Sequence, residues 1–377
     1  MLQRHFLLNL PLHLLPLLLL TLAACNPATP PPEATATATR SPTSTATQTA
    51  SPTSTPTAIR TPPALPPLYR NDSLTPFGSP HSYIQDKCQL ILDKWTSDNS
   101  SPGTVVMVIM FHSITSGDPS NPNQMSEFKL RTLMNKLHVE GFTAINTSQL
   151  AGFMEQNARI PPRSVLLVVD DRHYRRYFDL FFHQYWVDYG WPVVNAWISL
   201  DDPAGTLSLP DNIALENEGW VDHQAHGYIH NIPIGPNSSE DYILGELQKP
   251  IDFFLANFHK TPVAVIWPGG GFSPRAAEVA RQLGYRLGFT TNPRGPLMFD
   301  WVPLADVSDP QRPLWIPEGP VNDPLMVLPR YWDTDAIIHI PEVLQASQEA
   351  AAYAEENRAT ELEYYDIACT AQYEPIP

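Results

Sequence analysis

Residues 164–171 read Ser-Val-Leu-Leu-Val-Val-Asp-Asp, an apolar run that ends in two adjacent carboxylates. A run of Val and Leu without polar alternation is typical of a strand buried on both faces. A carboxylate pair directly after such a strand is costly unless other groups neutralise it. The stretch predicts a buried strand with a charged site at its carboxyl end. The alternative is that Asp170 and Asp171 only cap a following helix.

Short apolar runs alternate with helical patterns on both sides of this strand. The predicted strands are 104–110, 164–169, 193–198, 219–222, 263–267, 286–290 and 326–328, and the predicted helices are 125–141, 174–189, 240–258, 274–283 and 342–358. This order predicts an α/β fold with a parallel sheet covered by helices, either open or closed into a barrel. In such folds the chemistry lies at the carboxyl ends of the strands.

A second polar cluster, Asp222–His230, ends in His-Gly-Tyr-Ile-His. On one helical turn the four-residue spacing would place His226 and His230 on the same side, within reach of one metal ion. A zinc protease with this spacing has Glu directly after the first His, and here that position is Gly227. Two His and one Asp would form a three-ligand site that leaves a position for water.

The first 67 residues differ from the rest in composition. Arg4 and a Leu-rich run to Leu22 read as an export signal, and residues 22–25, Leu-Ala-Ala-Cys, resemble the lipobox of bacterial lipoproteins. We therefore expect residues 1–25 to be a signal peptide with lipidation at Cys25, and the protein to be anchored outside the cytoplasm. The alternative is a secreted protein with an ordinary signal.

Residues 26–67 contain 11 Pro and 16 Ser or Thr, which predicts a disordered stalk. The remaining chain carries a net charge of −18, since the whole sums to −16 and the first 67 residues hold three Arg and one Glu. Such an acidic body excludes nucleic acid as a partner, and we expect a monomer. Cys88 and Cys369 lie near the two ends of this body, where either a disulfide or two free thiols are possible.

Five segments together resemble the polysaccharide deacetylases, the NodB-homology domain of carbohydrate esterase family four. The resemblance runs from about Val105 to Arg330, and the segments are Met110–Ile114, Val168–Arg172, Asp222–His230, Ile266–Gly270 and Leu328–Arg330. It implies a single distorted (β/α) barrel over residues 105–340. An N-terminal extension (68–104) and a C-terminal helix and tail (341–377) would flank this domain.

The resemblance also implies a mechanism and a ligand set. Asp171, His226 and His230 would bind one divalent metal ion, zinc first, with cobalt or nickel as alternatives. Asp170 would be the base, and the segment Trp267–Gly269, with the N–H of Gly269, would contact the substrate and stabilise the oxyanion. His112 and Arg330 would support the site. A weaker match at 337–339 makes His339 a candidate general acid.

Two departures from the family pattern affect the surroundings of this site. Arg172 replaces a Gly and would crowd the pocket or reshape the turn, and Ile266 stands where many members have an Arg that orients the base. The implied activity is removal of acetyl groups from a polysaccharide, with N-acetyl-hexosamine polymers first and O-acetyl esters such as xylan second. The rival from another class is a glycan-binding lipoprotein without catalysis.

Overall fold

The centre of the protein is a parallel, curled sheet, which accounts for the continuous apolar runs in the sequence. A computed structural model describes residues 60–72, 74, 77–229, 232–312 and 315–376. Strands follow the order β10-β9-β8-β7-β6-β2-β12, with β5 beside β6, and every pair is parallel. Their bounds are β2 (Val105–Phe111), β5 (Thr143–Ala144), β6 (Arg163–Val169), β7 (Val193–Trp197), β8 (Val221–Ala225), β9 (Ala264–Ile266), β10 (Leu287–Phe289) and β12 (Tyr331–Trp332).

One short segment bridges the two edges of this curled sheet. The N–H of Leu328 donates to Gly288 of β10 at 2.7 Å, and three residues later Tyr331 pairs with Ile109 of β2. Residues 328–332 thus run from β10 at one edge of the sheet to β12 at the other edge, where β12 lies beside β2, and Arg330 lies between the two contacts. The distorted (β/α) barrel predicted from the sequence is confirmed.

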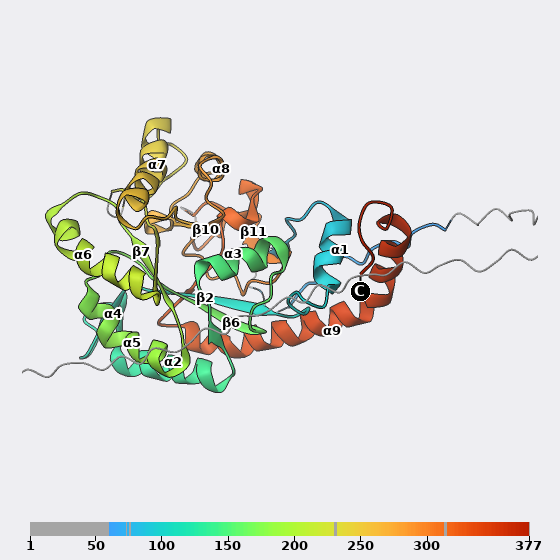
Figure 1. The fold of residues 1–377 in the computed structure, drawn as a ribbon, viewed down its shortest axis with the longest axis horizontal. Coiled ribbons are helices and arrows are strands. Elements are labelled where there is room, and N and C mark those ends of the chain that lie inside the picture. Colours follow the sequence, from blue (N-terminus) through green and yellow to red (C-terminus); the bar gives the residue numbers. More distant parts are fainter. Residues whose placement is uncertain (1–59, 73, 75–76, 230–231, 313–314, 377) are drawn as a thin grey trace, which may run out of the picture. The chain divides into compact units, whose positions relative to one another are not determined.

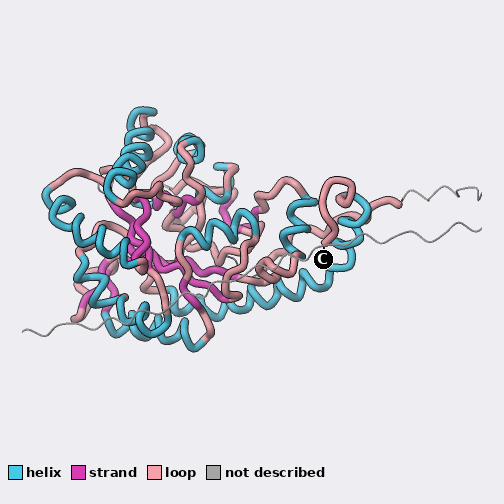
Figure 2. Tube along the Cα trace, in the orientation of Figure 1, coloured by secondary structure: helices cyan, strands magenta, loops and turns pink. Residues whose placement is uncertain are grey.

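Helices surround the sheet, and two small strand pairs lie outside it (Figures 1 and 2). The helices are α1 (Lys87–Trp95), α2 (Glu127–Val139), α3 (Thr147–Gln156), α4 (Arg175–Phe181), α5 (His183–Tyr189), α6 (Pro203–Glu218), α7 (Glu240–Asn257), α8 (Pro274–Gln282) and α9 (Ala336–Ala368). The pair β1 (Gly78–His81) and β11 (Val302–Ala305) is antiparallel, and the pair β3 (Ser113–Thr115) and β4 (Gln124–Ser126) is parallel. Short 3-10 turns lie at 268–270, 319–321 and 324–326.

Local sequence signals explain most helix boundaries. Ser126, Ser239 and Ser273 accept hydrogen bonds from N–H groups in the first turns of α2, α7 and α8. Gly190 and Gly219 end α5 and α6 with positive φ angles, which glycine adopts at little cost. The helix predicted at 174–189 therefore ends at the same residue as α5, Tyr189, although the structure divides this stretch at Phe182 into α4 and α5.

The C-terminal helix is much longer than the sequence analysis predicts. α9 has 33 residues rather than the 17 of the range 342–358, and it begins at Ala336. The predicted strand at 326–328 is absent, because Pro324 opens a 3-10 turn there and only Leu328 forms a bridge, to Phe289. α1, α3 and α6 were not among the predicted helices.

The beginning of the described chain packs on this long helix. Arg60 forms ion pairs with α9, and the hydroxyl of Tyr353 donates to the carbonyl of Pro67 at 2.8 Å. Leu65 packs in a cluster with residues of α1 and the end of α9. Residues 60–67, which the sequence analysis places in the disordered stalk, are therefore ordered on the domain, because they bury apolar surface there.

The rest of the predicted leader lies outside the described residues. This applies to the signal segment, to Cys25 and to residues 26–59 of the stalk. Within the described ranges, the helices include none with the length and apolar character needed to cross a membrane.

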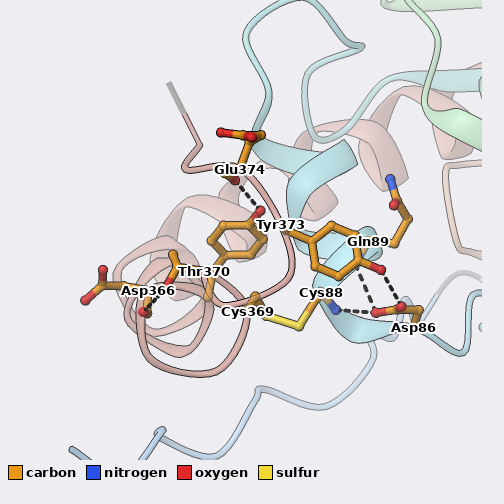
Figure 3. The surroundings of a disulfide bond; sticks show 9 residues. Asp86, Cys88, Gln89, Asp366, Cys369, Thr370, Tyr373 and Glu374 are labelled. Carbon is orange, nitrogen blue, oxygen red and sulfur yellow. Dashed lines mark hydrogen bonds between the residues drawn. A yellow bond between two sulfur atoms is a disulfide. The ribbon is translucent and has the colours of Figure 1, made fainter.

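A disulfide joins α1 to the end of α9, which is one of the two alternatives that the sequence leaves open. Cys88 and Cys369 are bonded, with their Cα atoms 5.4 Å apart (Figure 3). Beside the bond, Asp86 caps α1 and accepts a hydrogen bond from the Tyr373 hydroxyl at 2.5 Å. These contacts attach the C-terminal tail to the N-terminal extension.

We expect loss of this disulfide to destabilise the whole domain, because the bond closes a loop of 281 residues in the unfolded chain. Cys88→Ser or Cys369→Ser should lower the free energy of unfolding by about 2–4 kcal/mol. Urea unfolding of the full chain would measure this change. Dithiothreitol should reproduce the loss in the wild type and add nothing in the variants. Equal stabilities of oxidised and reduced wild type would contradict a role for the bond.

Candidate functional site

The centre of the site is an ion pair between Asp170, which follows β6, and Arg330. Guanidinium nitrogens of Arg330 lie 2.5 and 2.8 Å from the two carboxylate oxygens, and both side chains are almost fully buried. Burial raises the pKa of Asp170, but the charge and hydrogen bonds of Arg330 outweigh it and bring the pKa to about 2. Asp170 is therefore a carboxylate at neutral pH.

Asp171 and His226 face each other beside this pair. His226, which follows β8, lies with its Nε2 3.7 Å from an Asp171 oxygen, while its Nδ1 is 2.7 Å from the carbonyl of Ile266. A carbonyl only accepts, so Nδ1 carries a proton, and Nε2 is the ring nitrogen that faces Asp171. Asp171 has a φ of 65°, an uncommon left-handed conformation that Asp tolerates better than most residues.

This arrangement fits two ligands of one cation. Two ligand atoms about 2.1 Å from a tetrahedral zinc lie about 3.4 Å apart, which is close to the separation of Asp171 and His226. The carbonyl behind His226 is the partner that metal-binding imidazoles commonly have. The third predicted ligand, His230, lies outside the described residues. Within the ranges that are described, no group of three His, Cys, Asp or Glu side chains could hold a metal ion.

The segment after His226 is a loop and not the helical turn that the spacing suggests. Gly227 has a φ of 71°, and a Cβ there would lie 2.6 Å from Pro268 and 2.7 Å from the carboxylate of Glu246. Glu246, on α7, accepts hydrogen bonds from the N–H groups of Tyr228 and Ile229. Gly227 is required by this close packing, and Glu246 holds the chain that leads to His230. Sequence reasoning did not identify Glu246, because it lies 20 residues from His226.

His112 borders the site on its more accessible side. Its Nε2 is 3.8 Å from Asp170, and its ring stacks on Trp332 with centroids 5.4 Å apart. Nearby, the buried carboxyl of Asp333 has one oxygen without a hydrogen-bond partner. Burial raises the pKa of Asp333 to about 7. The sequence analysis did not select Asp333, although it directly follows a strand.

In the segment Trp267–Gly269, the first two residues are buried and the third is exposed. Trp267 is fully buried and donates from Nε1 to the carbonyl of Met326 at 2.8 Å, so its predicted contact with substrate is wrong. Pro268 is also buried and packs against Gly227. Gly269 is exposed, with a φ of 57°, at the second position of a 3-10 turn, where a backbone N–H has no partner within the turn.

Tertiary contacts compensate for both departures from the family pattern. Arg172 turns away from Asp170 and makes a bidentate ion pair with Asp202, so it does not crowd the site. Arg330 supplies the charge that Ile266 lacks.

His339 is placed apart from these residues. It lies on α9, 2.9 Å from Glu342 and beside the buried ring of Tyr331. Among the described residues, no hydrogen bond, ion pair or ring contact joins His339 to Asp170, Asp171 or His226. The site therefore has no support for the predicted acid role of His339.

We expect Arg330→Met to destabilise the protein by about 3–5 kcal/mol, because it leaves Asp170 as a buried carboxylate without its counterion. The double variant Asp170→Asn/Arg330→Met should be more stable than Arg330→Met alone. Urea unfolding of the metal-free full chain would measure both differences. The half-exposed pair Arg286–Glu155 offers a control, where Arg286→Met should cost less than about 1 kcal/mol. If the losses of stability caused by the changes at positions 170 and 330 were additive, the inferred coupling between the two charges would be contradicted.

Comparisons with known proteins agree with this fold. No family model matches the chain, and no curated protein matches it in sequence. A deacetylase of Streptococcus pyogenes, PplD in complex with acetate, aligns with a TM-score of 0.50 and 18% identity over 64% of this chain and 98% of its own. The polysaccharide deacetylase BC0361 of Bacillus cereus (TM-score 0.47, 16% identity, 64% and 69% coverage) and IcaB of Ammonifex degensii (0.47, 15%, 65% and 97%) also match. The fold of this chain is shared with the Streptococcus pyogenes deacetylase PplD.

Proposed function

We propose that the protein is a metal-dependent hydrolase that removes acetyl groups from a polysaccharide. The observation that carries this proposal is the buried, ionised Asp170, held by Arg330 beside a second carboxylate and the Nε2 nitrogen of His226. A protein that only binds glycans needs no proton acceptor beside a pair of metal ligands. The fold supports the same conclusion, since it is shared with deacetylases.

Asp171 and His226, together with His230, are the residues that would hold the metal ion. Zinc suits two imidazoles and one carboxylate, and cobalt or nickel would fit the same donors. When bound there, zinc acts as a Lewis acid on a carbonyl and lowers the pKa of a coordinated water to about 7.

The chain's own residues would perform the proton transfers. Asp170 accepts a proton from the attacking water, because Arg330 keeps its carboxylate ionised and fixes its orientation. The N–H of Gly269 donates a hydrogen bond to the oxygen that becomes negative when the acetyl carbonyl is attacked. His112, next to Asp170, would donate a proton to the leaving amine or alcohol, which its position 3.8 Å from that carboxylate supports. This assigns to His112 the acid role that the sequence analysis gave to His339.

N-acetyl-hexosamine polymers are the substrates that we favour, with O-acetyl esters second. Hydrolysis of an N-acetyl group produces a free amine, which is cationic at neutral pH. The strongly acidic body of this protein attracts such partly deacetylated polymers. A neutral xylan would not be attracted by this negative charge.

The direct test is acetate release by the full chain with added zinc or cobalt. Chitin oligomers, poly-N-acetylglucosamine, peptidoglycan and acetylated xylan would serve as substrates. Asp170→Asn should retain the metal and lower turnover at least about 100-fold, because it removes the proton acceptor. Asp171→Ala and His226→Ala should lose the metal, measured by elemental analysis of the dialysed protein.

The exposed Asp188 on α5 provides a matched control, since Asp188→Asn removes a carboxylate that is not among the site residues and should leave both the metal content and the turnover unchanged. Full activity of Asp170→Asn would refute the assigned base. No release from any substrate by metal-loaded protein would favour the glycan-binding alternative.

We also propose that the protein is a lipoprotein exposed outside the cytoplasm. The Leu-Ala-Ala-Cys sequence at residues 22–25 and the Pro- and Thr-rich stretch that follows support this proposal. The Cys88–Cys369 disulfide agrees with it, because disulfides persist in oxidising compartments. In bacterial cells given labelled palmitate, the wild type should incorporate label and Cys25→Ser should not. Equal labelling of both proteins would rule out lipidation at Cys25.

A further inference from the structure

A recess of about 290 Å³ lies directly beside Gly269. Its walls are the backbone of Gly269–Gly271, the loop Pro233–Pro236, and the side chains of Phe272 and Trp315, with Thr291, Asn292 and Ile316 completing the lining. We call this space the Trp315 recess. It is adjacent to the proposed oxyanion donor, so a polymer whose acetyl group lies at Gly269 would extend along it.

The Trp315 recess shares its framework with the proposed base. The carbonyl of Thr290 accepts a hydrogen bond from Nε of Arg330 at 2.7 Å, and the carbonyl of Asn292 accepts one from the Arg330 N–H at 3.2 Å. The short segment after β10 therefore contacts Arg330 through its backbone and lines the recess with Thr291 and Asn292.

Glycines allow the main chain to pack closely against the other walls of the Trp315 recess. A Cβ at Gly270 would collide with Thr291, and a Cβ at Gly271 would collide with Pro233. At Gly269 the main chain itself forms the surface, so a ligand can approach the backbone closely.

Trp315 is presented by an anchored loop. Three residues later, Glu318 is buried and accepts hydrogen bonds from the Asn292 side chain and from the N–H of Ala305 at the end of β11. The guanidinium of Arg312 lies over one face of the Trp315 indole. Trp315 is half-buried, so part of its surface stays accessible to a ligand.

We propose that Trp315 is the stacking platform of a sugar subsite, which binds the pyranose unit next to the acetylated one. The C–H groups on one face of a pyranose ring form an apolar surface that matches an indole, and its hydroxyls need polar partners. The Trp315 recess supplies both, with an aromatic ring, apolar walls and the polar groups of Thr291 and Asn292. This inference rests on the proposed function, because it names a binding position for that polymer.

The test is a binding measurement that needs neither metal nor turnover. Calorimetry would measure chitopentaose and xylopentaose binding to the metal-free full chain carrying Asp170→Asn. Adding Trp315→Ala should weaken binding of the preferred pentamer about 10- to 30-fold, as loss of a central Trp does in other interfaces. Trp315→Phe should restore most of the affinity, because it returns an aromatic surface. Trp186→Ala, which removes a half-buried Trp on α5, should have no effect.

A second readout separates stacking from damage to the fold. In protein labelled with ¹⁵N-tryptophan, the indole signal that disappears in Trp315→Phe should shift when the pentamer is added. Binding without that shift, equal affinity of Trp315→Ala, or no binding of either pentamer would overturn the subsite. Binding that depends on Trp315, in a protein that releases no acetate, would uphold the subsite and refute the hydrolase.

Discussion

The ion pair of Asp170 with Arg330 connects the closure of the barrel to the chemistry of its site. A buried carboxylate is tolerated only when an opposite charge and hydrogen bonds compensate its loss of hydration. Arg330 provides both, and it lies in the segment that bridges β10 and β2. The same five residues that join the two edges of the sheet therefore carry the counterion of the proposed base.

Helices and loops outside the barrel hold the remaining site groups in position. Glu246 on α7 fixes the chain after His226, the carbonyl of Ile266 orients the His226 ring, and Asp202 draws Arg172 away from the centre. Each of these partners is a main-chain group or a charged side chain. It compensates a polar or charged group whose burial would otherwise be unfavourable. The site is thus built from compensating contacts, and this explains how it accommodates Arg172 and Ile266 in place of the residues common among the proteins it resembles.

The N-terminal extension stabilises both the far end of the protein and the proposed subsite. At the far end, the disulfide and Tyr373 attach α1 to α9. Nearer the site, β1 pairs with β11, and Ser79 donates to Asp306 at 2.7 Å. Asp306 begins the loop that carries Trp315. The segment after the predicted stalk therefore supports the loop that forms one wall of the Trp315 recess.

The sequence by itself determined the alternation of strands and helices along the chain, the polar clusters at the strand ends and the candidate residues Asp170, Asp171 and His226, because local apolar patterns and short motifs record these features. Tertiary structure decided that Trp267 is buried, that His339 has no contact with the site residues, and that Arg330, which the sequence only suggested as a supporting residue, meets Asp170. It also brought Glu246 and Asp333 near the site. The physical reason is sequence separation. Asp170 and Arg330 are 160 residues apart, and only the curvature of the sheet brings their charges together.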